Sequence, residues 1–309
     1  MFPKASRIEC EDGVNIALNP IEKHPGLDTQ RWLARFSAEF SAQYGDTRLG
    51  KTEHFGPLRV QRPFFPEGPE CLHFYLLHPP GGLVGGDQLS IDLTLQDGAH
   101  VLMTTPSAGK IYNNISGIAQ GQHVSIAIGD GSVLEYLPQE NIVFDGADGQ
   151  LTTTIDISGN GLFVGWEITC LGRFESEQFF EQGQLMQSLM LRRDGMPLFS
   201  DRLQFAAPSP LQIGHAGFQN FHVFGTLLIN RDVMDQSEQT DDAVLQWQEN
   251  INQDARELTV AVTQKPGVFI VRVLGNKAEQ VRNSFEQLWA QLRNDVVGKE
   301  PCAPRIWRT

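Results

Sequence analysis

The feature that most constrains the fold is a stretch of prolines and glycines, HPPGGLVGGDQL, at residues 78–89. Two prolines remove backbone donors and fix φ, and glycines open regions of φ/ψ space that other residues avoid. The stretch is therefore a shaped connection and cannot be the interior of a helix or of a central strand. Alternating residues before and after it predict a strand on each side. The glycines at which side chains are expected to collide with neighbouring atoms are Gly81, Gly82, Gly85 and Gly86.

Asp87 stands where this corner becomes a strand, and three roles are open for it. It can accept hydrogen bonds from the backbone amides of its own turn, the usual role of an aspartate beside glycine. It can instead line a polar cavity or a metal path, or act as a catalytic acid or base. The stretch does not match a dinucleotide-binding loop, because its glycine spacing differs from G-x-G-x-x-G and a strand follows it instead of a helix.

A second unusual segment, TTPSAGKIY at residues 104–112, ends in Gly-Lys and invites comparison with phosphate-binding loops. Such a loop needs a glycine where Thr104 stands and a magnesium-binding Ser or Thr where Ile111 stands. The segment is therefore not a nucleotide site. We expect a shaped turn in which Lys110 is solvated or bonds to carbonyl groups.

Most of the chain has the pattern of β-strands. Even-numbered apolar residues from 32 to 40 predict a strand with one buried face. Turn signals then recur about every ten residues between 98 and 170, which favours stacked antiparallel strands over alternating strand–helix units. Residues 244–258 have helical spacing, and the clearest helix has one apolar face formed by Val281, Phe285, Leu288 and Leu292.

The predicted fold class is therefore mainly β: a large antiparallel, stacked-strand (β-solenoid-like) single domain with one or two α-helices near the C-terminus. Residues 1–30 are expected to form a loosely ordered N-terminal arm, and residues 31–309 one β domain. The acidic stretch RDVMDQSEQTDD predicts an exposed loop near 231–242.

Composition narrows the classes of function. The 309 residues include 24 Lys and Arg against 37 Asp and Glu, a net charge of −13, which disfavours nucleic-acid binding. The four cysteines are scattered without a C-x-x-C pair, so we expect reduced thiols and a cytoplasmic protein. Without a signal-peptide pattern or an apolar run long enough to span a bilayer, no membrane association is expected.

A third segment, residues 165–179, contains Glu167 within an apolar strand and Arg173 just beyond it. A buried carboxylate needs a partner, and Arg173 is the natural one. Structural pairing, a polar conduit and acid–base catalysis all remain open for Glu167. The eight histidines form neither H-E-x-x-H nor H-x-H, and His78 beside the glycine corner is the best single candidate for metal contact. The sequence predicts no catalytic residues and assigns no metal site.

The motifs at 78–89 and 104–112 together resemble the urease accessory protein UreD family, called UreH in some organisms. The resemblance extends to GPLRVQRPFFPEG at 56–68, to Glu167, Gly172, Arg173, Glu177 and Phe179, and to Pro304-Arg305-Ile306-Trp307, and it spans roughly residues 30–309. Glu175 and Ser176 depart from the family pattern, where a small residue and a glycine stand.

The resemblance implies a non-enzymatic urease maturation chaperone. Such a protein binds urease apoprotein, recruits UreF and, through UreF, the GTPase UreG, and assists nickel delivery through a polar internal passage. Ni²⁺ would be bound transiently, with no tightly bound cofactor. The candidate residues for the passage are Asp87, Glu167, Arg173, Glu177 and His78.

Other motif residues are expected to have structural roles: Gly81, Gly82, Gly85, Gly86, Pro106, Lys110, Tyr112, Gly172, Arg305 and Trp307. Two alternatives belong to other classes of function. One is a metal-dependent hydrolase that uses Asp87, His78 and Glu177. The other is a protein-binding module without any role in metal transfer.

Overall fold

The structure is a computed structural model that describes residues 32–234, 237–253 and 256–308. The N-terminal arm predicted for residues 1–30 lies outside the described residues. Among the residues described, none of the helices combines the length and hydrophobicity that crossing a bilayer requires.

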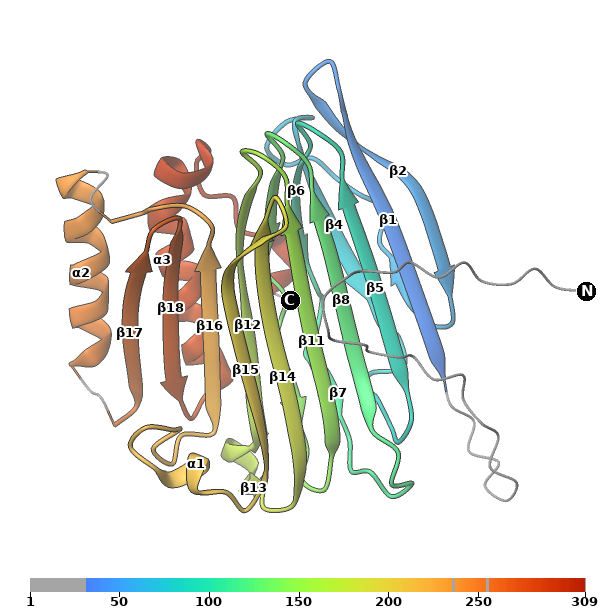
Figure 1. The fold of residues 1–309 in the computed structure, drawn as a ribbon, viewed down its shortest axis with the longest axis vertical. Coiled ribbons are helices and arrows are strands. Elements are labelled where there is room, and N and C mark those ends of the chain that lie inside the picture. Colours follow the sequence, from blue (N-terminus) through green and yellow to red (C-terminus); the bar gives the residue numbers. More distant parts are fainter. Residues whose placement is uncertain (1–31, 235–236, 254–255, 309) are drawn as a thin grey trace, which may run out of the picture. The chain divides into compact units, whose positions relative to one another are not determined.

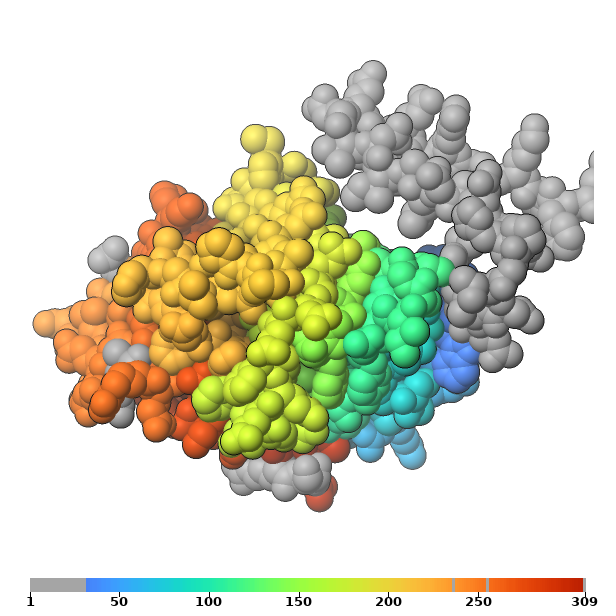
Figure 2. Space-filling view, turned by 90° about the horizontal axis from the view of Figure 1, so that it is seen from below, coloured from blue at the N-terminus to red at the C-terminus, as the bar shows by residue number. Residues whose placement is uncertain are grey.

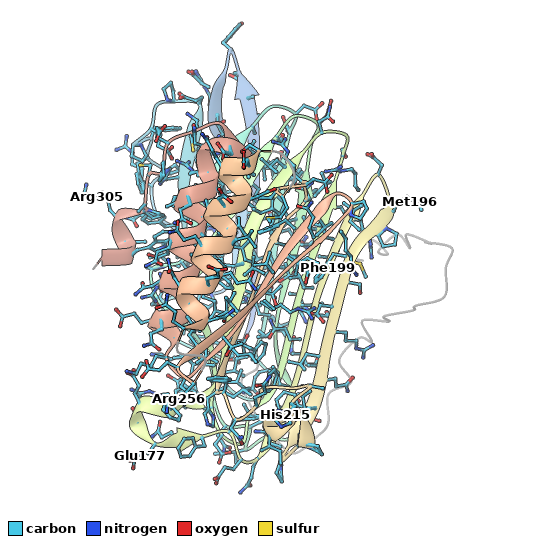
Figure 3. All side chains as sticks on the ribbon, turned by 90° about the vertical axis from the view of Figure 1, so that its left-hand side faces the viewer. Glu177, Met196, Phe199, His215, Arg256 and Arg305 are labelled. Carbon is cyan, nitrogen blue, oxygen red and sulfur yellow. The ribbon has the colours of Figure 1, made fainter. Side chains whose placement is uncertain are left out.

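Two β-sheets face each other, and helices cover the free side of one of them (Figures 1 and 3). We call the sheet without helices the outer sheet. Its seven strands are β1 (Leu33–Gln43), β2 (Asp46–Phe55), β5 (Gln88–Leu95), β8 (Gln120–Ile128), β11 (Asp148–Ile157), β14 (Gly183–Arg193) and β15 (Met196–Ala207). They are arranged in the order β15-β14-β11-β8-β5-β1-β2.

The sheet between the outer sheet and the helices is the central sheet. Its main strands are β3 (Arg59–Val60), β4 (Cys71–Leu77), β6 (His100–Thr104), β9 (Val133–Tyr136), β12 (Leu162–Arg173), β16 (Val223–Ile229), β17 (Leu258–Lys265) and β18 (Val268–Gly275). They follow the order β17-β18-β16-β12-β9-β6-β4-β3, and short strands join at one end: β7 (Gly109–Ile111), β10 (Asn141–Val143) and β13 (Gln178–Phe179).

The middle of the molecule is a solenoid, because the chain alternates between the two sheets and each coil stacks on the one before. In the central sheet, Cys71, His100, Val133 and Leu162 are aligned with one another on β4, β6, β9 and β12. Figure 2 shows the result from one end, with the colours changing in sequence order from cyan to orange across the stack.

The prediction of a mainly β, stacked-strand fold with helices near the C-terminus is confirmed. The expected antiparallel pairing holds outside the stacked coils, in pairs such as β1–β2, β14–β15, β12–β16 and β17–β18. Within the coils the paired strands are parallel, as in β5–β8 and β4–β6. The reason is geometric: each coil returns the chain to the same end before the next strand begins, so equivalent strands run in the same direction.

Two apolar layers result from the alternation of side chains along the central sheet. On β12, Phe163 and Leu171 join the core between the two sheets, whereas Trp166 and Ile168 face the helices. The alternation predicted for residues 32–40 is confirmed from residue 34 on, since Ala34, Phe36, Ala38 and Phe40 on β1 are all buried, whereas Trp32 lies before the strand and is exposed.

The helices are α1 (Pro210–Ile213), α2 (Glu238–Asn252) and α3 (Ala278–Val297), with short 3₁₀ turns η1 (Phe174–Ser176) and η2 (Arg305–Arg308). The predicted face of α3 is correct, because Val281, Phe285, Leu288 and Leu292 are buried against the central sheet. The acidic loop predicted near 231–242 is shorter than expected. Ser237 accepts a hydrogen bond from the amide of Thr240 and caps α2, so Glu238–Asp242 are helical.

Candidate polar passage between the sheets

The two sequence motifs meet at the first corner of the solenoid. The amide of Leu83 donates to the carbonyl of Lys110 at 2.7 Å, and the amide of Tyr112 donates to the carbonyl of Leu83 at 2.9 Å. The segment predicted to be a shaped turn thus ends in strand β7, where no helix follows to form a phosphate-binding loop. The Tyr112 ring stacks on Phe144 of the next coil, with ring centroids 5.0 Å apart.

The glycines of this corner are needed for two different reasons. A Cβ on Gly82 would lie 2.5 Å from the Tyr112 ring, and one on Gly85 would lie 2.1 Å from Ser116 Oγ, so the collision expected at these positions is present. At Gly81 and Gly86 the requirement is conformational, since their φ angles are +78° and +85°.

Asp87 is buried and uses both carboxylate oxygens on backbone amides. Oδ1 accepts from Trp32 at 3.2 Å and Oδ2 accepts from Val84 at 3.0 Å. Of its three possible roles, the structure therefore favours that of an acceptor for backbone amides, one from its own turn and one from the residue before β1. His78 lies close enough for the Asp87 charge to raise its pKa slightly, but burial is the larger effect and lowers the pKa of this imidazole.

Glu167 projects from β12 into the space between the two sheets. Its partners come from the outer sheet: Thr153 Oγ1 on β11 donates a short hydrogen bond to Oε1, and Gln187 Nε2 on β14 donates to Oε2 at 3.0 Å. Both partners are neutral. Because the carboxyl group is withdrawn from bulk water, burial raises the pKa of Glu167, and the nearby charge of Asp201 acts in the same direction.

Two cavities meet at this carboxyl group. The smaller, of about 70 Å³, lies under the glycine corner, and its lining includes His78, Pro106 and Glu167. The larger, of about 360 Å³, lies between β14 and β15 on one side and β16 to β18 on the other, and Glu167 and Asp201 both line it. Glu167 is thus the carboxylate that the two cavities share.

The larger cavity has an ion pair beside it. Asp201 Oδ2 on β15 accepts from Arg272 Nη2 on β18 at 2.7 Å, and both side chains are partly exposed. This pair joins the outer and central sheets where the cavity lies.

The ion pair expected between Glu167 and Arg173 does not form. Arg173 is exposed at the end of β12, beside Glu140 and His222 in a separate surface pocket. Gly172, with φ +81°, turns the strand away from the sheet core before Arg173 is reached. Glu177 is exposed on the turn that follows η1, as Figure 3 shows. The structure thus brings His78 and Glu167 to one cavity and leaves Arg173 and Glu177 outside it.

The C-terminal motif, residues 304–307, contacts the motif at residues 104–112 on the face of the central sheet that the helices cover. Trp307 Nε1 donates to Thr104 Oγ1 at 3.1 Å, and the indole packs against Trp166 and Trp289. Arg305 is exposed and points outward in Figure 3. The motifs of the resemblance therefore surround the same few coils.

Comparisons with known proteins agree with the resemblance. The profile of the family described as "UreD urease accessory protein" matches residues 33–308. The chain belongs to the UreD family. Urease accessory protein UreD of Saccharophagus degradans is 44% identical over 284 residues, which covers 91% of this chain and 94% of that protein. The UreD proteins of Chromohalobacter salexigens and Azoarcus sp. are 39% and 40% identical, over 92% and 90% of this chain and 91% and 94% of their own lengths.

Sequence analysis of this UreD-family chain missed three residues near the Glu167 carboxylate: Thr153, Gln187 and Asp201. Each occupies an inward position on an alternating strand, among neighbours such as Leu151, Leu189 and Phe199. A polar residue at an inward position is a signal that could have been noticed, because an unpartnered polar group in a core costs free energy. What alternation cannot supply is which of these positions face each other across the sheets.

Proposed function

We propose that this chain is a non-enzymatic urease maturation chaperone that binds urease apoprotein, recruits UreF and, through it, the GTPase UreG, and assists delivery of nickel to the urease active site. Membership of the UreD family supports the role in urease maturation, because the relatives are named accessory proteins. The partners and the passage of nickel are our extension of that role.

The observation that carries the nickel role is the position of Glu167. Its carboxyl group lies where two cavities meet between the sheets, and its hydrogen-bond partners Thr153 and Gln187 are neutral. A carboxylate that is buried without a cation binds one favourably, since a nearby positive charge stabilises the ionised form. We propose that nickel moves between Asp201 and His78 past Glu167.

Weak binding suits this role. A single carboxylate with amide and hydroxyl neighbours falls short of the several imidazole or thiolate ligands that hold nickel tightly. A path for ions must bind strongly enough for entry and weakly enough for release. The arrangement around Glu167 therefore favours transfer over storage.

The test is urease activation in cells that express the urease operon with this chain either wild type or as Glu167→Gln. We expect the variant to lower the nickel content and activity of purified urease, because the neutral amide cannot attract the cation. Pull-down of urease with the variant chain should remain normal, which separates transfer from docking. Glu177→Gln is the matched control, as this exposed glutamate lies outside the cavities.

Full nickel loading of urease with Glu167→Gln would rule out the path through this residue. Normal maturation of urease in cells that lack the chain would overturn the maturation role as a whole.

A further inference from the structure

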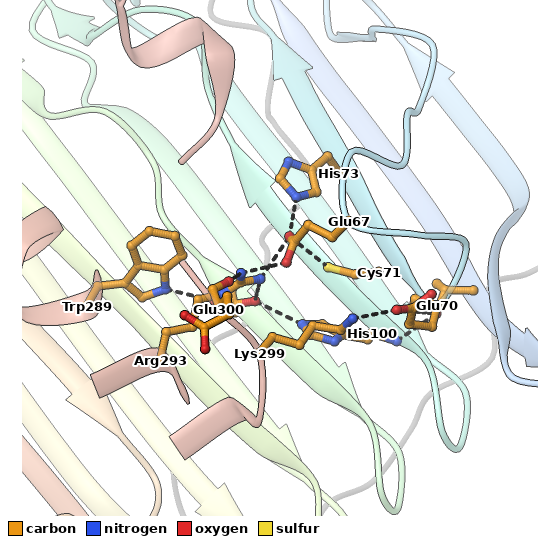
Figure 4. A network of polar contacts seen from close by, with 11 residues as sticks. Glu67, Glu70, Cys71, His73, His100, Trp289, Arg293, Lys299 and Glu300 are labelled. Carbon is orange, nitrogen blue, oxygen red and sulfur yellow. Dashed lines mark hydrogen bonds and ion pairs between the residues drawn. The ribbon is translucent and has the colours of Figure 1, made fainter. Parts of the chain in front are cut away.

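A second group of buried ionisable side chains lies on the opposite face of the central sheet, beneath α3 (Figure 4). Alternation along the strands places Cys71 and His73 of β4, His100 of β6 and Glu135 of β9 on this face, while Leu72, Val101 and Leu134 point into the core between the sheets. Glu67 reaches the group from the segment before β4. We call these five residues the α3-side cluster.

Arg293 of α3 enters the cluster and binds both of its carboxylates. Its Nη1 and Nη2 lie 2.6 and 2.9 Å from Glu67 Oε2 and Oε1. Its Nε and Nη2 lie 2.9 Å from Glu135 Oε2 and Oε1. Trp289 and His100 complete the shell of Glu135, at 2.7 and 2.9 Å. The guanidinium is fully buried.

The carboxylates and the guanidinium do not balance. Two carboxylates face one guanidinium, which leaves one negative charge unless His73 or His100, each in contact with one carboxylate, carries a proton. An uncompensated ion is costly in such a region. The Cys71 thiol does not add to it, since burial together with Glu67 and Glu135 raises the pKa of this group. A proton on an imidazole would compensate the charge, and so would a metal cation.

Part of the cluster has the donor set of a metal site. Glu67 Oε1 lies 2.7 Å from His73 Nε2 and 3.4 Å from Cys71 Sγ, and the ligand atoms of these three residues all lie within 4.8 Å of one another. One sulfur, one imidazole nitrogen and one carboxylate oxygen are the ligands that Zn²⁺ and similar ions take in proteins. His73 is fully buried, and its Nδ1 has no hydrogen-bond partner.

These three protein ligands leave one position of a tetrahedral site open, and in zinc sites with three protein ligands water fills the fourth position.

We propose that Glu67, Cys71 and His73 form a metal site for a thiophilic divalent ion of the zinc or nickel class. On binding, the Cys71 thiol releases its proton to solvent, and Arg293 gives up Glu67 while it keeps Glu135. The ion, the Cys71 thiolate and the Glu67 carboxylate then sum to zero charge, as do Arg293 and Glu135. The inference goes beyond the proposed function, because this site lies on the other face of the central sheet from Glu167.

The test uses the purified full-length chain with Co²⁺ as the probe, because a cobalt–thiolate bond absorbs in the near ultraviolet and carboxylate ligands do not give that band. We expect one ion per chain with a thiolate band that Zn²⁺ displaces. Cys71→Ser should abolish the band, and His73→Asn should weaken binding at least about tenfold, as loss of even an outer-shell partner costs this much. The matched controls are Cys170→Ser, a buried thiol on β12, and His100→Asn, which should both retain the band.

Arg293→Gln sharpens the result, since removal of the guanidinium that competes for Glu67 should tighten binding of Co²⁺. Absence of a cobalt–thiolate band in the wild-type chain would overturn the proposal, whatever the variants do. Loss of the band in His100→Asn with retention in His73→Asn would also overturn it. Because no urease is present, the outcome is independent of nickel transfer past Glu167.

Discussion

Glu167 and Glu135 are buried carboxylates on opposite faces of the same sheet, and they are stabilised in opposite ways. Glu167 faces the outer sheet, has neutral partners, and burial raises its pKa. For Glu135, burial alone would also raise the pKa, but the hydrogen bonds from His100 and Arg293 outweigh it and lower the pKa. The comparison shows that burial does not fix the state of a carboxylate; the charge supplied by its neighbours does.

The difference corresponds to two tasks. Glu135, bound on both oxygens by Arg293 and contacted by Trp289 and His100, ties α3 to the solenoid. A carboxylate held by a hydroxyl and an amide stays available, at a cost in stability when it ionises. If the proposed nickel path is correct, the residue that binds the passing cation and the residues that hold α3 in place lie on different faces of the central sheet.

The largest expected effect is the loss of stability on removing the buried guanidinium of Arg293, compared with the loss on removing the partly exposed guanidinium of Arg272. Arg293→Met leaves Glu67 and Glu135 without their cation and should cost about 3–5 kcal/mol in free energy of unfolding, as breaking a buried ion pair does. Arg272→Met, which breaks the partly exposed pair with Asp201, should cost less than about 1 kcal/mol. Urea unfolding of both variants measures the difference. Similar losses in the two would show that the α3-side cluster contributes no more than a surface ion pair.

The next effect is on pH dependence. For Glu67, burial alone would raise the pKa, but hydrogen bonds from His73 and Arg293 lower it to about 2. A lowered pKa contributes stability above the unfolded value of 4.5, which is lost as the pH falls towards 2. Glu67→Gln should therefore be less stable than wild type by about 1–3 kcal/mol near pH 7. Thermal unfolding across the pH range should show this gap narrowing only below about pH 4.5.

Glu167 should give the opposite slope. Its raised pKa favours the protonated carboxyl, so its contribution to stability is present below the unfolded value and is lost as the pH rises through the folded one. Glu167→Gln should match wild type near pH 4.5 and become the more stable of the two as the pH rises. Parallel pH profiles for Glu67→Gln and Glu167→Gln would contradict the contrast between the two faces.

The smallest effect concerns the hydroxyl that holds Glu167. Thr153→Val removes the donor from β11 and should cost about 1 kcal/mol, the typical net contribution of one hydrogen bond. It should also raise the pKa of Glu167 further, because the lost bond favours the charged form. Thr154→Val, one position along on the other face of β11, is the matched control and should change stability by less than about 0.5 kcal/mol. Equal effects of the two substitutions on urea unfolding would show that the contact contributes nothing.

The alternation of apolar and polar residues predicted those features of the fold that depend on a single segment of the chain. The buried faces of β1, β5 and α3 follow from spacing alone, and so does the presence of a glycine corner before Asp87. The direction of strand pairing could not be predicted, because turn signals mark where a strand ends and not which strand becomes its neighbour. For this reason antiparallel pairing was predicted where the strands of successive coils pair in parallel.

Sites that assemble across coils were beyond the same reasoning. Cys71, His100 and Glu135 are far apart in sequence and meet only because successive coils stack β4, β6 and β9 in parallel. The spacing of Cys71 and His73, two residues apart on one strand, was a local sign that both side chains share a face. The partner of Glu167 was misjudged for a related reason, since Arg173 is near in sequence but lies beyond the turn at Gly172.

The contacts of Arg293 can form only late in synthesis of the chain. A ribosome releases the coils one after another, and each can stack on its predecessor as it emerges, as domains fold from the N-terminal side during synthesis. Glu67 and Glu135 cannot form their ion pairs until Arg293 has been synthesised, 226 and 158 residues later. Until α3 is made, a nascent solenoid therefore has Glu67 and Glu135 with His73 and His100 as partners but without their guanidinium, on a face that no helix covers.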